Sequence, residues 1–131
     1  MLDQVPVLIA ENEPFIALDL AMAVVDAGGE VVGPVASVRE ALALLERTPV
    51  RAAILDVNLI DRDISPVVEI LWGLGVPIII QTGVGVPSEL KARFPDLIVH
   101  TKPCLATELV AQLAALLSDH QAPRRAAERF K

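Results

Sequence analysis

The stretch Arg51-Ala-Ala-Ile-Leu-Asp56-Val-Asn58-Leu-Ile60 decides the fold of this chain. A run of alanine, isoleucine and leucine without alternating polar residues is typical of a strand buried between two layers of helix. Asp56 follows that run directly, so we expect it where the strand emerges at its carboxyl end. In an open parallel sheet, ligands and reacting groups collect at this edge. The stretch therefore predicts an α/β sheet with Asp56 at its functional edge.

Three other apolar runs also end in polar side chains. Residues 5–10 lead into Glu11-Asn12-Glu13, residues 76–82 end in the hydroxyl of Thr82, and residues 97–101 lead into Lys102-Pro103. Acidic side chains bind hard divalent cations and a carboxylate can attack phosphorus. A hydroxyl and an ammonium stabilise the charge that develops on phosphoryl oxygens. The four strand ends together predict a site that accepts a phosphoryl group.

This ordered set resembles the site of a response-regulator receiver domain. The resemblance covers roughly residues 5 to 118, and it rests on Glu11, Asp56, Asn58, Thr82 and Lys102-Pro103. It implies that Asp56 is the phospho-acceptor, with Thr82 and Lys102 beside it and a Lys-Pro peptide bond that is usually cis. It also implies a Mg²⁺ site made of Glu11, Asn12, Asp56 and the backbone carbonyl of Asn58.

Asn12 and Val99 depart from the receiver pattern. Asn12 stands where the family has the stronger of two acidic metal ligands, so Mg²⁺ binding is expected to be weak. Val99 stands where an aromatic switch residue is usual. The segment from Gln81 to Gly85 instead resembles the Thr-Gly signature of a single-domain receiver subclass from general stress signalling, although Ile80 and Val84 replace aromatics that are typical there.

Segments with helical patterns alternate with the strands. The expected helices cover residues 15–27, 38–47, 66–74, 88–94 and 105–120, and a short strand covers residues 30–35. Ser37 and Glu40 form a capping box, and Gly28-Gly29 and Gly75 end their helices. This alternation predicts a doubly wound five-stranded parallel sheet with helices on both faces. The strand order 2-1-3-4-5 is implied by the resemblance to receivers.

Charge divides the chain into two parts. Residues 1–120 carry 7 Lys and Arg against 16 Asp and Glu, whereas residues 121–131 carry 4 basic residues and 1 acidic residue. We expect one domain over residues 1–120 and a flexible basic tail over residues 121–131. Because the domain is acidic, it repels nucleic acid.

The sequence favours the cytoplasm. The N-terminus lacks the basic start and long apolar run of a signal peptide, and no apolar run approaches the ~20 residues of a membrane span. The single Cys104 cannot form an internal disulfide. No contact with membrane is therefore expected.

The sequence is compatible with two functions for a receiver domain. The favoured interpretation is a stand-alone receiver that takes a phosphoryl group from a histidine kinase or histidine phosphotransfer protein and signals by protein contact. The alternative is a degenerate receiver that binds partners without phosphorylation, which Asn12 favours. A phosphohydrolase needs a second carboxylate where Asn58 stands, and a nucleotide site needs a glycine-rich phosphate loop in place of the acidic Glu11–Glu13 segment. We therefore expect a signalling module and not an enzyme.

Two of the expected helices are short of polar residues. They cover residues 15–27 and 105–117, and in the receiver fold they lie side by side. Because contiguous exposed apolar patches mark interfaces, these helices are predicted to form a homodimer or to dock a partner.

Overall fold

The structure is a computed structural model that describes residues 1–129, with side chains described for residues 1–119. Strands and helices alternate along the chain, as the sequence predicts. The strands are β1 (Pro6–Ala10), β2 (Glu30–Val35), β3 (Ala52–Asp56), β4 (Ile78–Thr82) and β5 (Ile98–Thr101). The helices are α1 (Pro14–Asp26), α2 (Val38–Arg47), α3 (Ser65–Gly73), α4 (Ser88–Arg93) and α5 (Ala106–Arg129).

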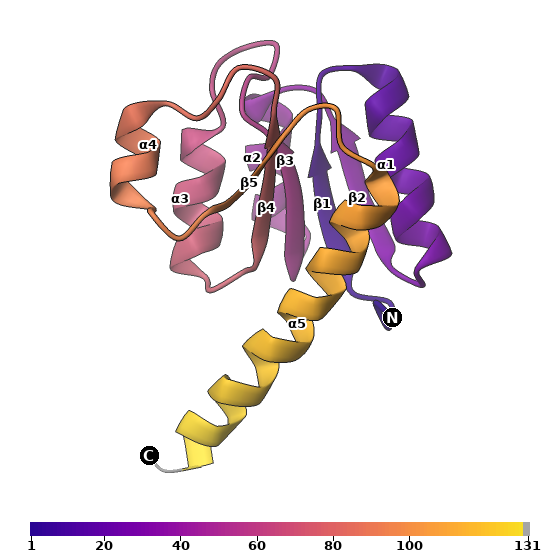
Figure 1. Cartoon of the computed structure of the whole chain (residues 1–131), viewed down its shortest axis with the longest axis vertical. Coiled ribbons are helices and arrows are strands. Elements are labelled where there is room, and N and C mark those ends of the chain that lie inside the picture. The colour runs from indigo at the N-terminus through magenta and orange to yellow at the C-terminus, as the bar shows by residue number, and fades with distance from the viewer. Residues whose placement is uncertain (130–131) are drawn as a thin grey trace.

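The five strands form one parallel sheet in the order β2-β1-β3-β4-β5, which confirms the expected fold (Figure 1). All residues of β3 and β4 are buried, because helices cover both faces of these central strands. The carboxyl ends of the strands lie together at the top of Figure 1. This topology places Glu11, Asp56, Thr82 and Lys102 at one edge of the sheet.

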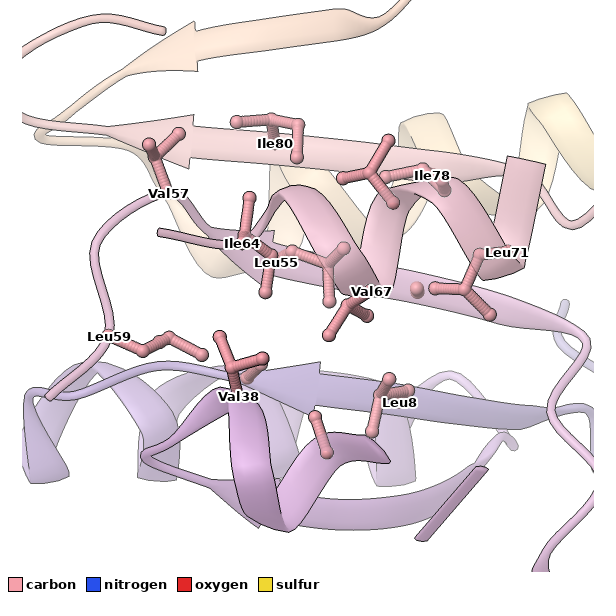
Figure 2. Close-up of a cluster of buried hydrophobic side chains, with 14 of the residues drawn as sticks. Leu8, Val38, Leu55, Val57, Leu59, Ile64, Val67, Leu71, Ile78 and Ile80 are labelled. Atoms are coloured by element: carbon pink, nitrogen blue, oxygen red, sulfur yellow. The ribbon is translucent and has the colours of Figure 1, made fainter. Parts of the chain in front are cut away.

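Two apolar cores lie on opposite faces of the sheet. Helices α2, α3 and α4 cover one face, where Leu8, Leu55 and Ile80 pack against Val38, Val67 and other helix side chains (Figure 2). Helices α1 and α5 cover the other face, over β1, β3 and β4. The alternation of side chains along each strand sends neighbouring residues to different cores, which explains why the buried strands are apolar throughout.

Polar side chains cap the N-terminus of α2. The serine half of the predicted capping box is confirmed, since Ser37 Oγ accepts a hydrogen bond from the Glu40 N–H at 3.0 Å. The Glu40 carboxylate accepts from the Ser37 hydroxyl at 2.9 Å. Asp61 also binds this helix, with its carboxylate accepting bonds from the Val38 and Arg39 N–H groups at 2.8 and 3.0 Å. These bonds tie the loop that follows Asp56 to the start of α2.

The last helix is longer than the sequence analysis expected. Helix α5 continues to Arg129 instead of ending near His120, so residues 121–129 extend the helix past the sheet (Figure 1). Alanine and arginine favour a helix in this segment, whereas Pro123 within it is unfavourable for one. The basic side chains of the 121–131 segment lie outside the described side chains, and the division of the chain at residue 120 stays a prediction. Within the described residues, no helix is long and apolar enough to span a membrane.

Candidate functional site

One lysine joins two buried carboxylates at the carboxyl edge of the sheet. Glu11 follows β1, Asp56 ends β3, and Lys102 follows β5. The Lys102 Nζ atom lies 2.9 Å from Glu11 Oε1 and 3.2 Å from Asp56 Oδ2. Glu11 is 2% exposed and Asp56 is 5% exposed, so both carboxylates depend on protein donors. The structure thus brings together the three charged residues that the sequence singled out.

The turn that carries Lys102 is held against the neighbouring strand. The Lys102 N–H donates to the Thr82 carbonyl at 2.8 Å, and the Lys102–Pro103 peptide bond is cis, as the receiver resemblance implies. This geometry aims the lysine side chain back across the ends of β4 and β3.

Glu11 is held by two further donors. Gln81 Nε2 donates to Glu11 Oε1 at 2.9 Å, and the Glu13 N–H donates to Glu11 Oε2 at 3.0 Å. Glu13 also places its own carboxylate near the site, with Oε2 at 4.0 Å from Lys102 Nζ and a side chain that is 64% exposed. Both oxygens of Glu11 are therefore bonded.

The charges of the site shift the proton affinity of its groups. Burial raises the pKa of Asp56, and the adjacent Glu11 carboxylate raises it further, while Lys102 lowers it; the pKa of Asp56 is about 6. Burial lowers the pKa of Lys102, but its hydrogen bonds to Glu11 and Asp56 outweigh this effect and raise that pKa above its ordinary value. At neutral pH a charged lysine therefore lies beside both carboxylates, and Asp56 takes up a proton as the pH falls through about 6.

Thr82 lies at the same edge but its hydroxyl is engaged elsewhere. Thr82 Oγ1 donates to the Gly85 carbonyl at 3.0 Å and accepts from the Gly85 and Val84 N–H groups at 3.0 and 3.2 Å. These bonds close the loop between β4 and α4. Thr82 is 1% exposed, so a phosphoryl group on Asp56 can engage the hydroxyl only if this loop rearranges.

The oxygen donors at this edge fit a Mg²⁺ ion. Mg²⁺ commonly takes one or two carboxylates and completes its coordination with water, and Glu11 and Asp56 supply two. The sequence-predicted Asn12 and Asn58 are both exposed beside them, after β1 and β3. Within the described part of the chain, no group of three or more His, Cys, Asp or Glu side chains is arranged to hold a metal. The site therefore offers fewer charges than a fully acidic one.

Two acidic residues in the loop after β3, Asp61 and Asp63, are bonded to helix ends and do not replace the acid missing at Asn12. Asp61 binds the N-terminus of α2, and hydrogen bonds from the Val38 and Arg39 N–H groups help lower the pKa of Asp61. Asp63 accepts a bond from the Ser65 N–H at 2.9 Å at the start of α3, and hydrogen bonds from Ser65 lower its pKa. Glu13 is the remaining nearby carboxylate.

Sequence reasoning missed the role of Gln81. It named Gln81 only as part of the Thr-Gly signature, whereas the structure buries its amide to 2% exposure and bonds it to Glu11. The available signal was a single amide within the otherwise apolar run Ile78-Ile-Ile-Gln81. A buried amide needs a partner, but the sequence does not say which one.

Of the two helices predicted to form an interface, α1 carries an exposed apolar patch. Outward positions of α1 expose Phe15, Leu18, Met22 and Val25 by 55% to 84%. Over residues 106–119, where the side chains of α5 are described, most apolar residues face the sheet core and do not share the patch. Leu105, just before α5, is 63% exposed. A hollow of about 370 Å³ lies between α1 and the start of α5, and Glu13, Gln81 and Lys102 line its polar wall.

Solved structures with the same fold cover most of this chain. SdrG from Pseudomonas melonis Fr1, in its BeF3-activated conformation, is 38% identical, with a TM-score of 0.67 and coverage of 89% of this chain and 99% of that one. The response regulator PhyR from Brucella abortus is 32% identical, with a TM-score of 0.76 over 96% of this chain and 53% of that one.

A more distant structure shows the same architecture. The response regulator receiver domain protein (CheY-like) from Methanospirillum hungatei JF-1 is 21% identical, with a TM-score of 0.78 over 89% of this chain and 96% of that one. The sequence matches no protein-family model and none of the curated protein sequences compared.

Proposed function

Because the chain belongs to the response-regulator receiver family, we propose that it is a phospho-acceptor of a two-component phosphorelay, with Asp56 as the acceptor. The observation that carries this proposal is the bridge that Lys102 makes between Asp56 and Glu11. A buried carboxylate beside a fixed ammonium is a suitable nucleophile for phosphorus, since the ammonium remains to bind the new charge.

The proposed reaction forms an acyl phosphate on Asp56. A carboxylate oxygen of Asp56 attacks the phosphorus of a phosphohistidine on the donor protein, the new O–P bond forms, and the N–P bond breaks as the donor imidazole leaves. Lys102 binds a phosphoryl oxygen, and Thr82 binds another after its loop moves. When bound, Mg²⁺ neutralises charge on the phosphoryl oxygens, and Glu11 and Asp56 are the side chains to hold it.

We propose that the phosphorylated protein signals by binding other proteins. The donor is a histidine kinase or a histidine phosphotransfer protein, and the loop closed by Thr82 connects the acceptor to the surface around α4. The relative SdrG has been solved in a BeF3-activated conformation, which supports testing the same phosphoryl analogue on this chain.

The test is intact-mass analysis after incubation with a small phosphodonor and Mg²⁺. Wild type is expected to gain one phosphoryl group and Asp56→Asn none. Asp96→Asn, which changes an exposed carboxylate before β5, is a matched control expected to label like wild type. Labelling of Asp56→Asn at the wild-type level overturns the assignment of the acceptor.

A degenerate receiver is the second candidate, and Asn12 is the observation that favours it. The position carries no charge, and Asp61 and Asp63 are bonded to helix ends, so the site has few acidic groups with which to bind a cation. This candidate predicts that wild type gains no mass from any phosphodonor while it still binds its partner protein.

A further inference from the structure

We infer that Gln81 is a positioning residue that holds Glu11 in place at the phosphoryl-acceptor site. This inference rests on the proposed function, because it gives Gln81 a role in binding the cation and in phosphorylation. It starts from one contact, the 2.9 Å hydrogen bond from Gln81 Nε2 to Glu11 Oε1. The two residues lie 70 positions apart in the sequence and are both 2% exposed.

The hydrogen bond between Gln81 and Glu11 joins side chains at the ends of two strands that are not neighbours in the sheet. In the sheet, β3 lies between β1 and β4, and Gln81 is the register partner of Asp56. The amide therefore passes the end of β3, beside the acceptor carboxylate, to reach the residue that follows β1. Lys102 bonds to the same oxygen of Glu11.

Packing alone does not explain why a glutamine stands at position 81, because its amide is buried. The three residues before Gln81 in β4 are isoleucines, and an apolar side chain suits a fully buried strand position. Burying an amide costs free energy unless it is hydrogen-bonded, and within the described residues every buried side-chain N or O atom has a partner. The bond to Glu11 is what makes an amide suitable at this position.

Gln81 differs from Lys102 in what it must do during the reaction. The Lys102 ammonium bonds to both Glu11 and Asp56, and in the proposed reaction it also binds the incoming phosphoryl group. Gln81 is neutral and is anchored in the sheet, so it keeps its bond to Glu11 when the ammonium moves. Together with the Glu13 N–H on Oε2, it keeps Glu11 oriented toward the cation.

Two variants and one control test this role. Gln81→Met keeps the length of the side chain and removes the donor, and Gln81→Asn keeps an amide that is one methylene too short to reach Glu11. Ile79→Val, two residues earlier on the same face of β4, is the control because it alters core packing without touching Glu11.

The first readout is cation affinity, measured by titration calorimetry with Mg²⁺ alone. Partners that orient a ligating carboxylate typically change metal affinity by about 10- to 100-fold when they are removed, so both Gln81 variants are expected to bind Mg²⁺ at least about tenfold more weakly. Their labelling by a small phosphodonor is expected to slow by a similar factor. Ile79→Val is expected to match wild type in both measurements.

The second readout needs no metal and follows the position of Glu11 itself. The Glu13 N–H donates to Glu11 Oε2, so its rate of exchange with solvent reports whether that carboxylate stays in place. In metal-free protein, the Glu13 amide is expected to exchange faster in both Gln81 variants and at the wild-type rate in Ile79→Val. Unchanged Mg²⁺ affinity and unchanged Glu13 exchange in the Gln81 variants overturn the inference and leave the proposed function standing. If wild type neither binds Mg²⁺ nor labels, the proposed function fails, and the Glu13 exchange rate still decides whether Gln81 positions Glu11.

Discussion

Lys102 lies closer to Glu11 than to the candidate acceptor Asp56, with Nζ–O distances of 2.9 and 3.2 Å. The lysine therefore neutralises two buried carboxylates at once and is not committed to the acceptor alone. Loss of its charge leaves both carboxylates without a counter-ion in a part of the protein that excludes most water.

Replacement of Lys102 by alanine is expected to destabilise the fold without abolishing it. Breaking a buried ion pair from one side costs about 3–5 kcal/mol, and proton uptake by Asp56 limits the cost here to about 2–4 kcal/mol. Urea unfolding at pH 7 measures this loss, and phosphodonor labelling measures the expected loss of signalling chemistry. A variant as stable as wild type shows that the ion pair contributes nothing to the fold.

Replacement of Asp56 by asparagine is expected to stabilise the metal-free protein at neutral pH. The pKa of Asp56 rises from an ordinary 3.8 to about 6, so the folded state binds this proton more tightly than the unfolded chain does. The favourable contribution is complete below pH 3.8 and is lost as the pH rises through 6. At pH 7 the charged carboxylate therefore costs on the order of 1–3 kcal/mol, and the variant recovers it.

Denaturant unfolding in a chelator between pH 4 and pH 8 checks this effect. The difference between Asp56→Asn and wild type is expected to grow with pH and to level off near pH 7. Asp96→Asn changes an exposed carboxylate and is expected to show no such pH dependence. A difference that shrinks as the pH rises contradicts the sign derived from the raised pKa.

Restoration of an acid at position 12 is expected to tighten Mg²⁺ binding. At an effective dielectric near 20, a carboxylate at ~4 Å from the cation contributes roughly 4 kcal/mol per unit of cation charge before the cost of desolvation. Even after desolvation reduces this energy strongly, we expect Mg²⁺ affinity to rise about tenfold. Titration calorimetry of Asn12→Asp beside wild type measures it. Equal affinities point to Glu13 as the replacing ligand, and Glu13→Gln then weakens the wild-type site.

Removal of the Thr82 hydroxyl is expected to weaken both the loop and the switch. In Thr82→Val the Gly85 and Val84 N–H groups lose their shared acceptor, which costs about 0.5–1.5 kcal/mol per hydrogen bond because these exposed residues bond to water instead. Thr82→Ser keeps the hydroxyl and is the matched control. Thermal unfolding measures stability, and amide chemical-shift changes on adding beryllofluoride measure loop movement. Equal movement in both variants contradicts a switch role for the hydroxyl.

The exposed face of α1 is expected to be an interaction surface. Leu18 and Met22 lie one turn apart at its centre and are 55% and 56% exposed. The double change Leu18→Lys and Met22→Glu is expected to leave the free energy of unfolding within about 0.5 kcal/mol, as for most surface changes. It is expected to reduce phosphotransfer from the donor protein, or self-association, by about tenfold, because central apolar contacts dominate interfaces.

Light scattering and phosphotransfer rates are the measurements for this surface. Leu74→Lys is the matched control, since Leu74 is 64% exposed after α3 and lies away from α1. Unchanged phosphotransfer together with an unchanged oligomeric state in the double variant excludes α1 as the docking face.

The sequence by itself determined the order of elements and the edge at which the site forms. Continuous apolar runs and helix caps are local patterns, and parallel strands bring their carboxyl ends to one edge whatever the side-chain details. Asp56 and Lys102 were therefore identifiable from strand ends alone. The Ser37 cap of α2 was local in the same way, and the structure contains its hydrogen bond from the Glu40 N–H.

Only the tertiary structure decided which of several candidate partners meet. Asp61 follows Asp56 closely in the sequence, but the loop after β3 brings it to the start of α2. Gln81 reaches Glu11 only because the sheet places β3 between their strands. Likewise, α1 and α5 are both apolar, and only their packing shows that α1 keeps an exposed stripe. Periodicity assigns side chains to a face, whereas contacts between residues far apart in the chain depend on how the elements are placed against one another.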